Sequence, residues 1–187
     1  MIVFNRIKKE LDTKLRHATQ LVEVCRKAKI DSDRAIALIH SGKPKAAASL
    51  IKSAEKKLAK AGVLLRAHPD LYATNMQINL AYQEYAEAQI LVAILAAKPL
   101  PKLSVPAECY LTGLADAVGE LNRAFLQARM RKDEVTANRL LERALEIDDL
   151  LKAFNYPDFV AANLRRKKDI VRIIINNMLT AQARVRE

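Results

Sequence analysis

The first 41 residues contain neither glycine nor proline, and the whole chain of 187 residues has only four glycines and six prolines. Within that stretch apolar side chains recur three or four residues apart, from Phe4 to Cys25, which predicts one long helix or two end-to-end helices. A β-sheet domain needs many turn residues together with β-branched or aromatic strands, and aromatic residues make up only 5% of this chain. The scarcity of helix-breaking residues therefore favours an all-α fold.

The few glycines and prolines that do occur divide the remaining chain into helical segments. Further helices are expected at about 44–66, 73–97, 106–132, 134–154 and from 159 to the C-terminus. No linker between them is long, and no internal repeat is visible. We therefore expect residues 1–187 to form a single domain, a bundle of about six to seven helices.

The charge of the chain points to an anionic partner. Its 32 Lys and Arg residues outnumber 21 Asp and Glu residues, for a formal net charge of +11. Such an excess either keeps a protein soluble or attracts nucleic acid. Cys25 and Cys109 form no CxxC pair, so we expect a cytoplasmic protein without disulfides. The longest apolar stretch, 88–97, is too short to span a membrane, so we expect no membrane partner.

The segment from Leu71 to Ala97 carries only two charged residues, Glu84 and Glu87, and is otherwise apolar on nearly every side. A helix of this kind belongs in a core, and the two carboxylates lie one turn apart on it. Buried ionised carboxylates need a cation, because they repel one another and lose their hydration. That cation is either an Arg or Lys from a neighbouring helix or a bound metal ion.

The following helix carries a second acidic pair, Asp116 and Glu120, four residues apart and nearly opposite its leucine stripe. These residues either face solvent or line a cavity or an interface. Gly113 and Ala117 share their face and would allow close approach of another backbone or a ligand.

If the two acidic pairs converge, they form an all-oxygen site that suits Mg²⁺ or Mn²⁺. A di-iron helical bundle needs a Glu-x-x-His motif on two helices, and this sequence contains no such motif. We expect His17, His40 and His68 to be structural or exposed. Carboxylate-bound Mg²⁺ is suited to phosphoryl transfer, so a basic protein with such a site indicates a nuclease.

Two segments resemble the translin family, and within it the TRAX branch. Residues 83–88 (QEYAEA) resemble the Q-E-Y-x-E-A segment of that branch. Residues 110–123 (YLTGLADAVGELNR) resemble its longer Y-L-x-G-x-A-D-x-x-G-E-L-x-R segment, and residues 26–40 are similar to the first-helix segment of the family. Asp116 places the chain nearer the TRAX branch, because translin itself has Val-Leu-Ile where this chain has 114–116.

The resemblance implies a translin-like all-α protomer that assembles into a hollow octamer and holds single-stranded or duplex RNA, or single-stranded DNA, against its inner surface. The TRAX branch is a Mg²⁺-dependent endoribonuclease, and its motif carries over Glu84, Glu87 and Asp116 as metal ligands. Glu120 would be a further catalytic ligand.

Arg34 and Arg123 lie within the matching segments and are expected to contact RNA near the site. Asp33 stands where relatives commonly have Lys, and would either add a carboxylate to the site or remove a phosphate contact.

Two alternatives to a ribonuclease remain open at this point. The same basic charge fits a nucleic-acid-binding module without chemistry, like translin itself. The acidic pair would also fit a helical scaffold in which Glu84 and Glu87 belong to a core salt bridge. An Arg or Lys between Glu84 and Glu87 without a water-accessible cavity would support the scaffold, whereas a cavity reached by both acidic helices argues against it. Cleavage of RNA separates the other two.

Overall fold

The computed structural model describes residues 2–73 and 76–183, and within these residues it contains helices and no strand. The helices are α1 (Ile2–His40), α2 (Pro44–Ala67), α3 (Asp70–Ala73), α4 (Met76–Leu95), α5 (Ala107–Met130), α6 (Glu134–Lys152) and α7 (Leu164–Ala183). The predicted all-α bundle is confirmed. No helix in the described part of the chain is both long and apolar enough to cross a lipid bilayer.

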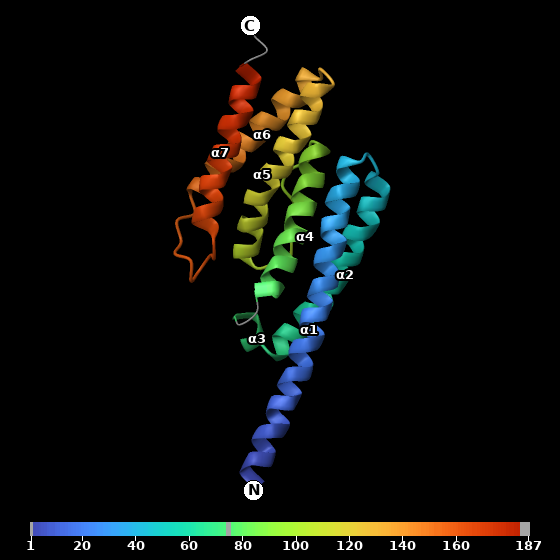
Figure 1. Ribbon diagram of the computed structural model, residues 1–187, viewed down its shortest axis with the longest axis vertical. Helices are drawn as coiled ribbons and strands as arrows, with labels where there is room; N and C mark the ends of the chain where they lie inside the picture. Colours follow the sequence, from blue (N-terminus) through green and yellow to red (C-terminus); the bar gives the residue numbers. More distant parts are fainter. Residues whose placement is uncertain (1, 74–75, 184–187) are drawn as a thin grey trace.

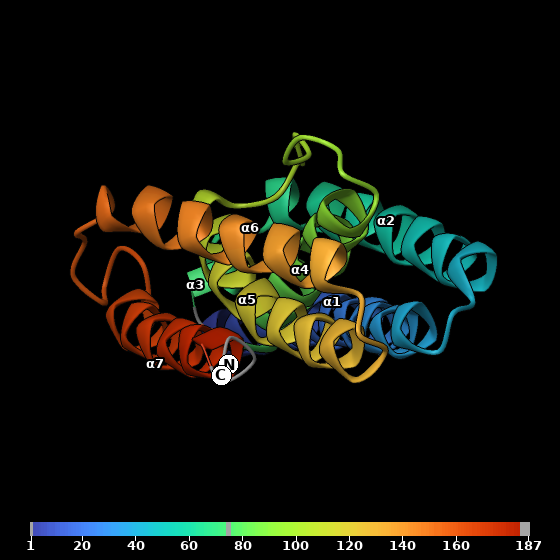
Figure 2. The same cartoon turned by 90° about the horizontal axis from the view of Figure 1, so that it is seen from above.

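The long helices lie side by side along the longest axis of the molecule (Figure 1). α1 packs against α2 and α4, α4 packs against α5, and α5 packs against α6 and α7. α4 therefore lies between α1 and α5, in the interior of the bundle. Viewed from above, α2 and α6 lie on one side of the molecule and α1, α5 and α7 on the other (Figure 2).

The helix boundaries follow local chain chemistry. α1 is one continuous helix, and Gly42 in the left-handed region (φ 71°) turns the chain into α2, whose first residue is Pro44. Asp133 caps α6 by accepting a hydrogen bond from the Thr136 backbone N–H at 3.0 Å. The turns at Gly42 and Asp133 leave neighbouring helices antiparallel (Figure 1).

The observed helices differ from the predicted ones in two places, an additional short helix and the start of α7. The short helix α3 was not expected, because four residues carry no periodic signal. α7 begins at Leu164 rather than near residue 159. Asn163, immediately before it, has a left-handed φ of 62°, which a helix does not continue through. The chain therefore reaches α7 through a longer turn region than its sequence suggests.

α4 is buried almost all round, as its composition predicts. Its buried side chains are Ile78, Ala81, Tyr82, Tyr85, Ala86, Glu87, Ala88, Ile90, Leu91, Ala93 and Ile94. α5 approaches it closely at Gly113, where a Cβ atom would lie only 2.7 Å from the Gln83 carbonyl oxygen and 3.1 Å from the Glu87 nitrogen. The expected close approach at Gly113 is thus made by the backbone of α4, and it sets the two acidic helices face to face.

The first half of α1 projects beyond the rest of the bundle (Figure 1). Its apolar stripe is exposed, with exposed fractions between 47% and 75% for Val3, Phe4, Ile7, Leu11 and Leu15. From Leu21 onward the helix packs against α2 and α4, and its apolar side chains such as Leu21, Cys25 and Ala28 are buried. A stripe of this length exposed on a protomer is typical of a contact surface for another chain.

A candidate metal centre between α4 and α5

Four carboxylates meet where α4 faces α5. Glu84 and Glu87 come from α4, and Asp116 and Glu120 come from α5. Gln83 Nε2 donates to Asp116 Oδ2 at 2.8 Å, which joins the two helices at this point. The other three carboxylates all lie close enough to Glu87 to raise its pKa. The structure therefore brings together the four residues that the sequence predicts, here called the acidic cluster.

Glu87 is the most deeply placed member of the cluster. Its exposed fraction is 7%, and no hydrogen bond or ion pair of its carboxyl occurs among the described residues. Burial and the other carboxylates of the cluster raise the pKa of Glu87 to about 9. Lys167 opposes this shift in pKa only partly, so the environment disfavours the ionised form of Glu87.

Glu84 and Asp116 are each paired with a lysine from an outer helix. Lys167 of α7 lies with its Nζ 2.5 Å from Asp116 Oδ1 and 2.6 Å from Oδ2. Lys29 of α1 lies 2.8 Å from Asp33 Oδ2 and 3.7 Å from Glu84 Oε1. Burial, opposed by Lys29 and reinforced by Asp33, raises the pKa of Glu84 to about 7. Asp33 thus places a further carboxylate beside Glu84.

Glu120 is held by a histidine of α1 for which the sequence indicates no role in the site. His40 Nε2 lies 2.5 Å from Glu120 Oε2, and the His40 side chain is only 3% exposed. The helical period could have indicated it, because Lys29, Asp33 and His40 fall on one side of α1 at about 100° per residue. His17 and His68 lie elsewhere, with their rings 4.2 Å apart.

The two arginines chosen from the sequence lie at the solvent edge. Arg123 follows Glu120 by one turn, with Nη1 3.9 Å from Glu120 Oε2, and its side chain is 56% exposed. Arg34 is exposed on α1 next to Asp33. Arg123 borders the acidic cluster directly, whereas Arg34 has no contact with it among the described residues.

The donor set of the cluster suits a hard divalent cation, since all its ligand atoms are carboxylate oxygens. The buried carboxyl of Glu87 supports such an ion, because its ionised form is costly to bury unless a cation compensates the charge. Within the described residues no three Asp, Glu, His or Cys side chains already form a ligand set. Glu84, Glu120 and Asp116 are instead paired with Lys29, His40 and Lys167.

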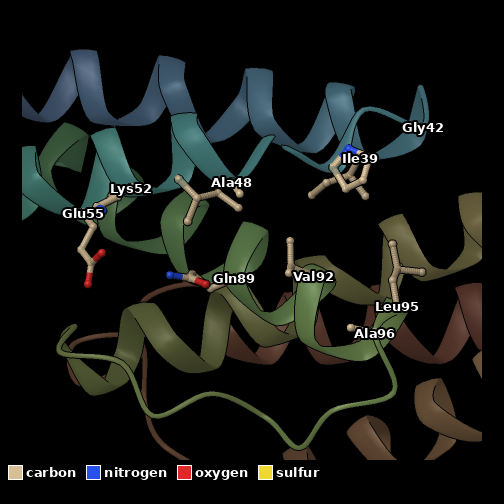
Figure 3. A pocket seen from close by; sticks show the side chains of 11 residues that line it. Ile39, Gly42, Ala48, Lys52, Glu55, Gln89, Val92, Leu95 and Ala96 are labelled. Atoms are coloured by element: carbon tan, nitrogen blue, oxygen red, sulfur yellow. The ribbon is translucent and has the colours of Figure 1, made fainter. Parts of the chain in front are cut away.

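A separate apolar pocket lies between α2, α4 and the α1–α2 turn (Figure 3). Its volume is about 710 Å³, and Ile39, Ala48 and Val92 are among the side chains that line it. Gln89 and Val92 lie on a different side of α4 from Glu84 and Glu87. The pocket contains no member of the acidic cluster, so we assign it no part in metal binding.

No family model matches the chain. Among solved structures, AfC3PO in a complex with duplex RNA is similar to it with a TM-score of 0.89 and 32% identity, over 98% of this chain and 99% of that one. The crystal structure of AfC3PO alone matches equally, over 98% of both chains. Apo-NeC3PO shares the fold, with a TM-score of 0.84 and 21% identity over 95% of this chain and 94% of that one.

A curated sequence is also similar. An uncharacterised protein of Methanocaldococcus jannaschii is 34% identical over 102 residues, which span 52% of this chain and 46% of that protein. The match thus covers about half the length of each protein. The solved structures, by contrast, match nearly the whole chain.

Proposed function

The protein belongs to the translin family, and on that premise we propose that it binds RNA and cleaves it by hydrolysis of phosphodiester bonds at the acidic cluster. The binding part of the proposal is supported by the AfC3PO complex, in which a protein similar over nearly the whole chain holds duplex RNA. The net charge of +11 supports it further, because phosphate contacts depend on Lys and Arg.

The observation that carries the cleavage part is the buried carboxyl of Glu87 among three other carboxylates. Glu84, Glu87 and Asp116 would hold Mg²⁺ or Mn²⁺, with Glu120 as a further ligand. When bound, such an ion neutralises negative charge on a phosphodiester and makes water a better nucleophile. Glu87 would release its proton to solvent to serve as a ligand.

The residues around the cluster orient it and provide a place for phosphates. His40 fixes the direction of the Glu120 carboxyl through their contact at 2.5 Å. Gln83 fixes Asp116 in the same way from α4. Arg123 is exposed beside Glu120 and can contact a phosphate that approaches the cluster from solvent. The substrate would thus meet positive charge at the edge and negative charge inside.

The test is cleavage of labelled single-stranded and duplex RNA with Mg²⁺, with Mn²⁺ and with EDTA. We expect EDTA to abolish cleavage, and Glu87→Gln or Asp116→Asn to slow it about 100-fold or more, because a catalytic metal supplies several kcal/mol. Glu142→Gln, an exposed site on α6, is the matched control and should cleave normally. Cleavage by the Glu87→Gln variant at the rate of the native protein would refute the proposed chemistry.

A second candidate is nucleic-acid binding without chemistry, and the lysine pairs favour it. Lys167 and Lys29 lie close enough to Asp116 and Glu84 to compensate their charges within the protomer. Binding of single-stranded RNA, duplex RNA and single-stranded DNA, measured by fluorescence anisotropy in EDTA, should then persist and weaken with salt. If binding is found and no divalent ion supports cleavage, this second function replaces the first.

We further propose that the protein works as a homo-oligomer, an octamer by analogy with the family. The exposed apolar stripe of α1 supports assembly, because it covers nothing in the protomer. The partner that suits it is a second copy of this chain, since a long apolar stripe on a projecting helix can pack against its own equivalent. Light scattering after size exclusion gives the mass directly.

A further inference from the structure

Lys167 occupies a position that conflicts with a metal ion at Asp116. Its ammonium group contacts both carboxylate oxygens, at 2.5 and 2.6 Å. Divalent ions also bind carboxylates through these oxygens, and Mg²⁺ needs them at about 2.1 Å. Two cations repel one another strongly at such separations. The ammonium group and a divalent ion therefore cannot both hold Asp116 as Lys167 does here.

The lysine contacts also match a divalent ion in charge. Lys167 at Asp116 and Lys29 at Glu84 bring two single positive charges to the cluster from two different helices. One divalent ion carries the same total. A divalent ion could therefore replace the positive charge that the two lysine contacts bring to the cluster.

The backbone around Lys167 is fixed, so the exchange needs only a side-chain rotation. The next residue, Lys168, is 8% exposed and donates to the Phe154 carbonyl at 2.9 Å and to Asn155 Oδ1 at 2.8 Å. These hydrogen bonds join the start of α7 to the residues that directly follow α6. Lys167 itself has a flexible four-carbon stem and a side chain that is 20% exposed, so its ammonium group can turn toward solvent.

We propose that Lys167 is a tethered counter-ion: it holds Asp116 in the metal-free protein, releases it when a divalent ion binds, and then contacts a phosphodiester oxygen of the RNA. This inference rests on the proposed function. It assigns Lys167 two partners in turn, the Asp116 carboxylate and the substrate phosphate. Substrate contact by Lys167 is thereby restricted to the metal-loaded protein.

The first test is Mn²⁺ binding without RNA, followed by the electron paramagnetic resonance signal of free Mn²⁺. Lys167→Met, which keeps the length and removes the charge, should bind Mn²⁺ about tenfold more tightly than the native protein, the order of effect that one nearby charge has on a carboxylate. Arg166→Met removes an exposed charge from the same turn and should leave Mn²⁺ affinity unchanged. Equal or weaker Mn²⁺ binding by Lys167→Met overturns the proposal.

The second test follows Lys167 directly in the native protein. Acetylation by an amine-reactive ester, quantified by mass spectrometry at each lysine, should increase several-fold at Lys167 on addition of Mn²⁺. The exposed Lys60 on α2 serves as the internal reference. If acetylation of Lys167 is unaffected by saturating Mn²⁺, the ammonium group does not leave Asp116 and the inference fails.

The third test concerns RNA and separates this inference from the proposed function. With Mn²⁺ bound, Lys167→Met should raise the KM for RNA several-fold and lower the salt dependence of binding by about one phosphate contact. If the native protein cleaves RNA and Lys167→Met has native KM and Mn²⁺ affinity, only the inference about Lys167 is wrong. If neither protein cleaves RNA while Lys167→Met still binds Mn²⁺ more tightly, only the proposed chemistry is wrong.

Discussion

The seam between α4 and α5 buries carboxylates, whereas the first half of α1 exposes apolar side chains. At the seam, Glu87 is 7% exposed although burial opposes its ionisation. On α1, the apolar side chains of Phe4 and Leu11 are 75% and 59% exposed, although removing them from water would be favourable. Neither arrangement stabilises a single protomer. Both arrangements would be stabilised by something outside the protomer, namely the cation proposed at the seam and the second chain proposed on α1.

The two regions also differ in how tightly the fold defines them. At the seam, Gly113 lets α5 approach the Gln83 carbonyl so closely that even a methyl group would collide. The projecting part of α1 has no such neighbours, and its first turns extend past the bundle (Figure 1). Substitutions at the seam should therefore change protomer stability strongly. Substitutions on the projecting part should change only what binds to it.

The largest effect is expected from Gly113→Ala. The added Cβ would lie 2.7 Å from the Gln83 carbonyl oxygen, so α4 and α5 must separate. Gly119→Ala on the same helix is the matched control, because a Cβ there meets nothing within 4 Å. The control should gain up to about 1 kcal/mol from helix propensity. Overpacking should leave Gly113→Ala about 2–4 kcal/mol less stable than the control in urea unfolding.

Equal stability of the two alanine variants would show that the helices can separate without cost. The α4–α5 contact would then be no more tightly constrained than the projecting part of α1. A loss of divalent-ion binding in Gly113→Ala, with helix content retained by circular dichroism, would show in addition that the spacing of the helices sets the spacing of the carboxylates.

Local sequence indicates the two acidic pairs, because their signals lie within single helices, and it leaves open whether the pairs converge. The uncharged surroundings of Glu84 and Glu87 predicted a buried α4, and Gly113 beside Asp116 predicted a close neighbour. Lys167 and His40 were not assigned to the site, since their partners are 51 and 80 residues away in the chain. Helical periodicity gives the side of a helix on which a residue lies. Which helix covers that side depends on the tertiary arrangement.

The next largest effect concerns the buried acid itself. Because the pKa of Glu87 rises from 4.5 to about 9 on folding, the folded state binds more protons over that range and loses stability as the pH rises through it. Glu87→Gln removes this loss. We expect the variant to be about 1–3 kcal/mol more stable than the native protein at pH 7 in EDTA, and equally stable at pH 4.

Urea unfolding at both pH values, with Glu142→Gln as the exposed control, checks this sign. Saturating Mn²⁺ should reverse the order at pH 7, because it stabilises only the protein that keeps the Glu87 carboxylate. A Glu87→Gln variant that is less stable than the native protein in EDTA would mean that a partner within the fold already compensates the carboxyl.

The smallest effect on the fold, and the clearest on assembly, is expected from Leu11→Glu. Leu11 is 59% exposed on the projecting part of α1, and Val63 on α2 is 58% exposed, so Val63→Glu is a control of nearly equal exposure. Each substitution should change the stability of the protomer by less than about 0.5 kcal/mol. Only Leu11→Glu should lower the mass measured by light scattering, because it places a charge in the apolar stripe. A lower mass for both variants would mean that exposed apolar residues outside the α1 stripe also contribute to assembly. An unchanged mass for both would show that the α1 stripe is not part of the assembly surface.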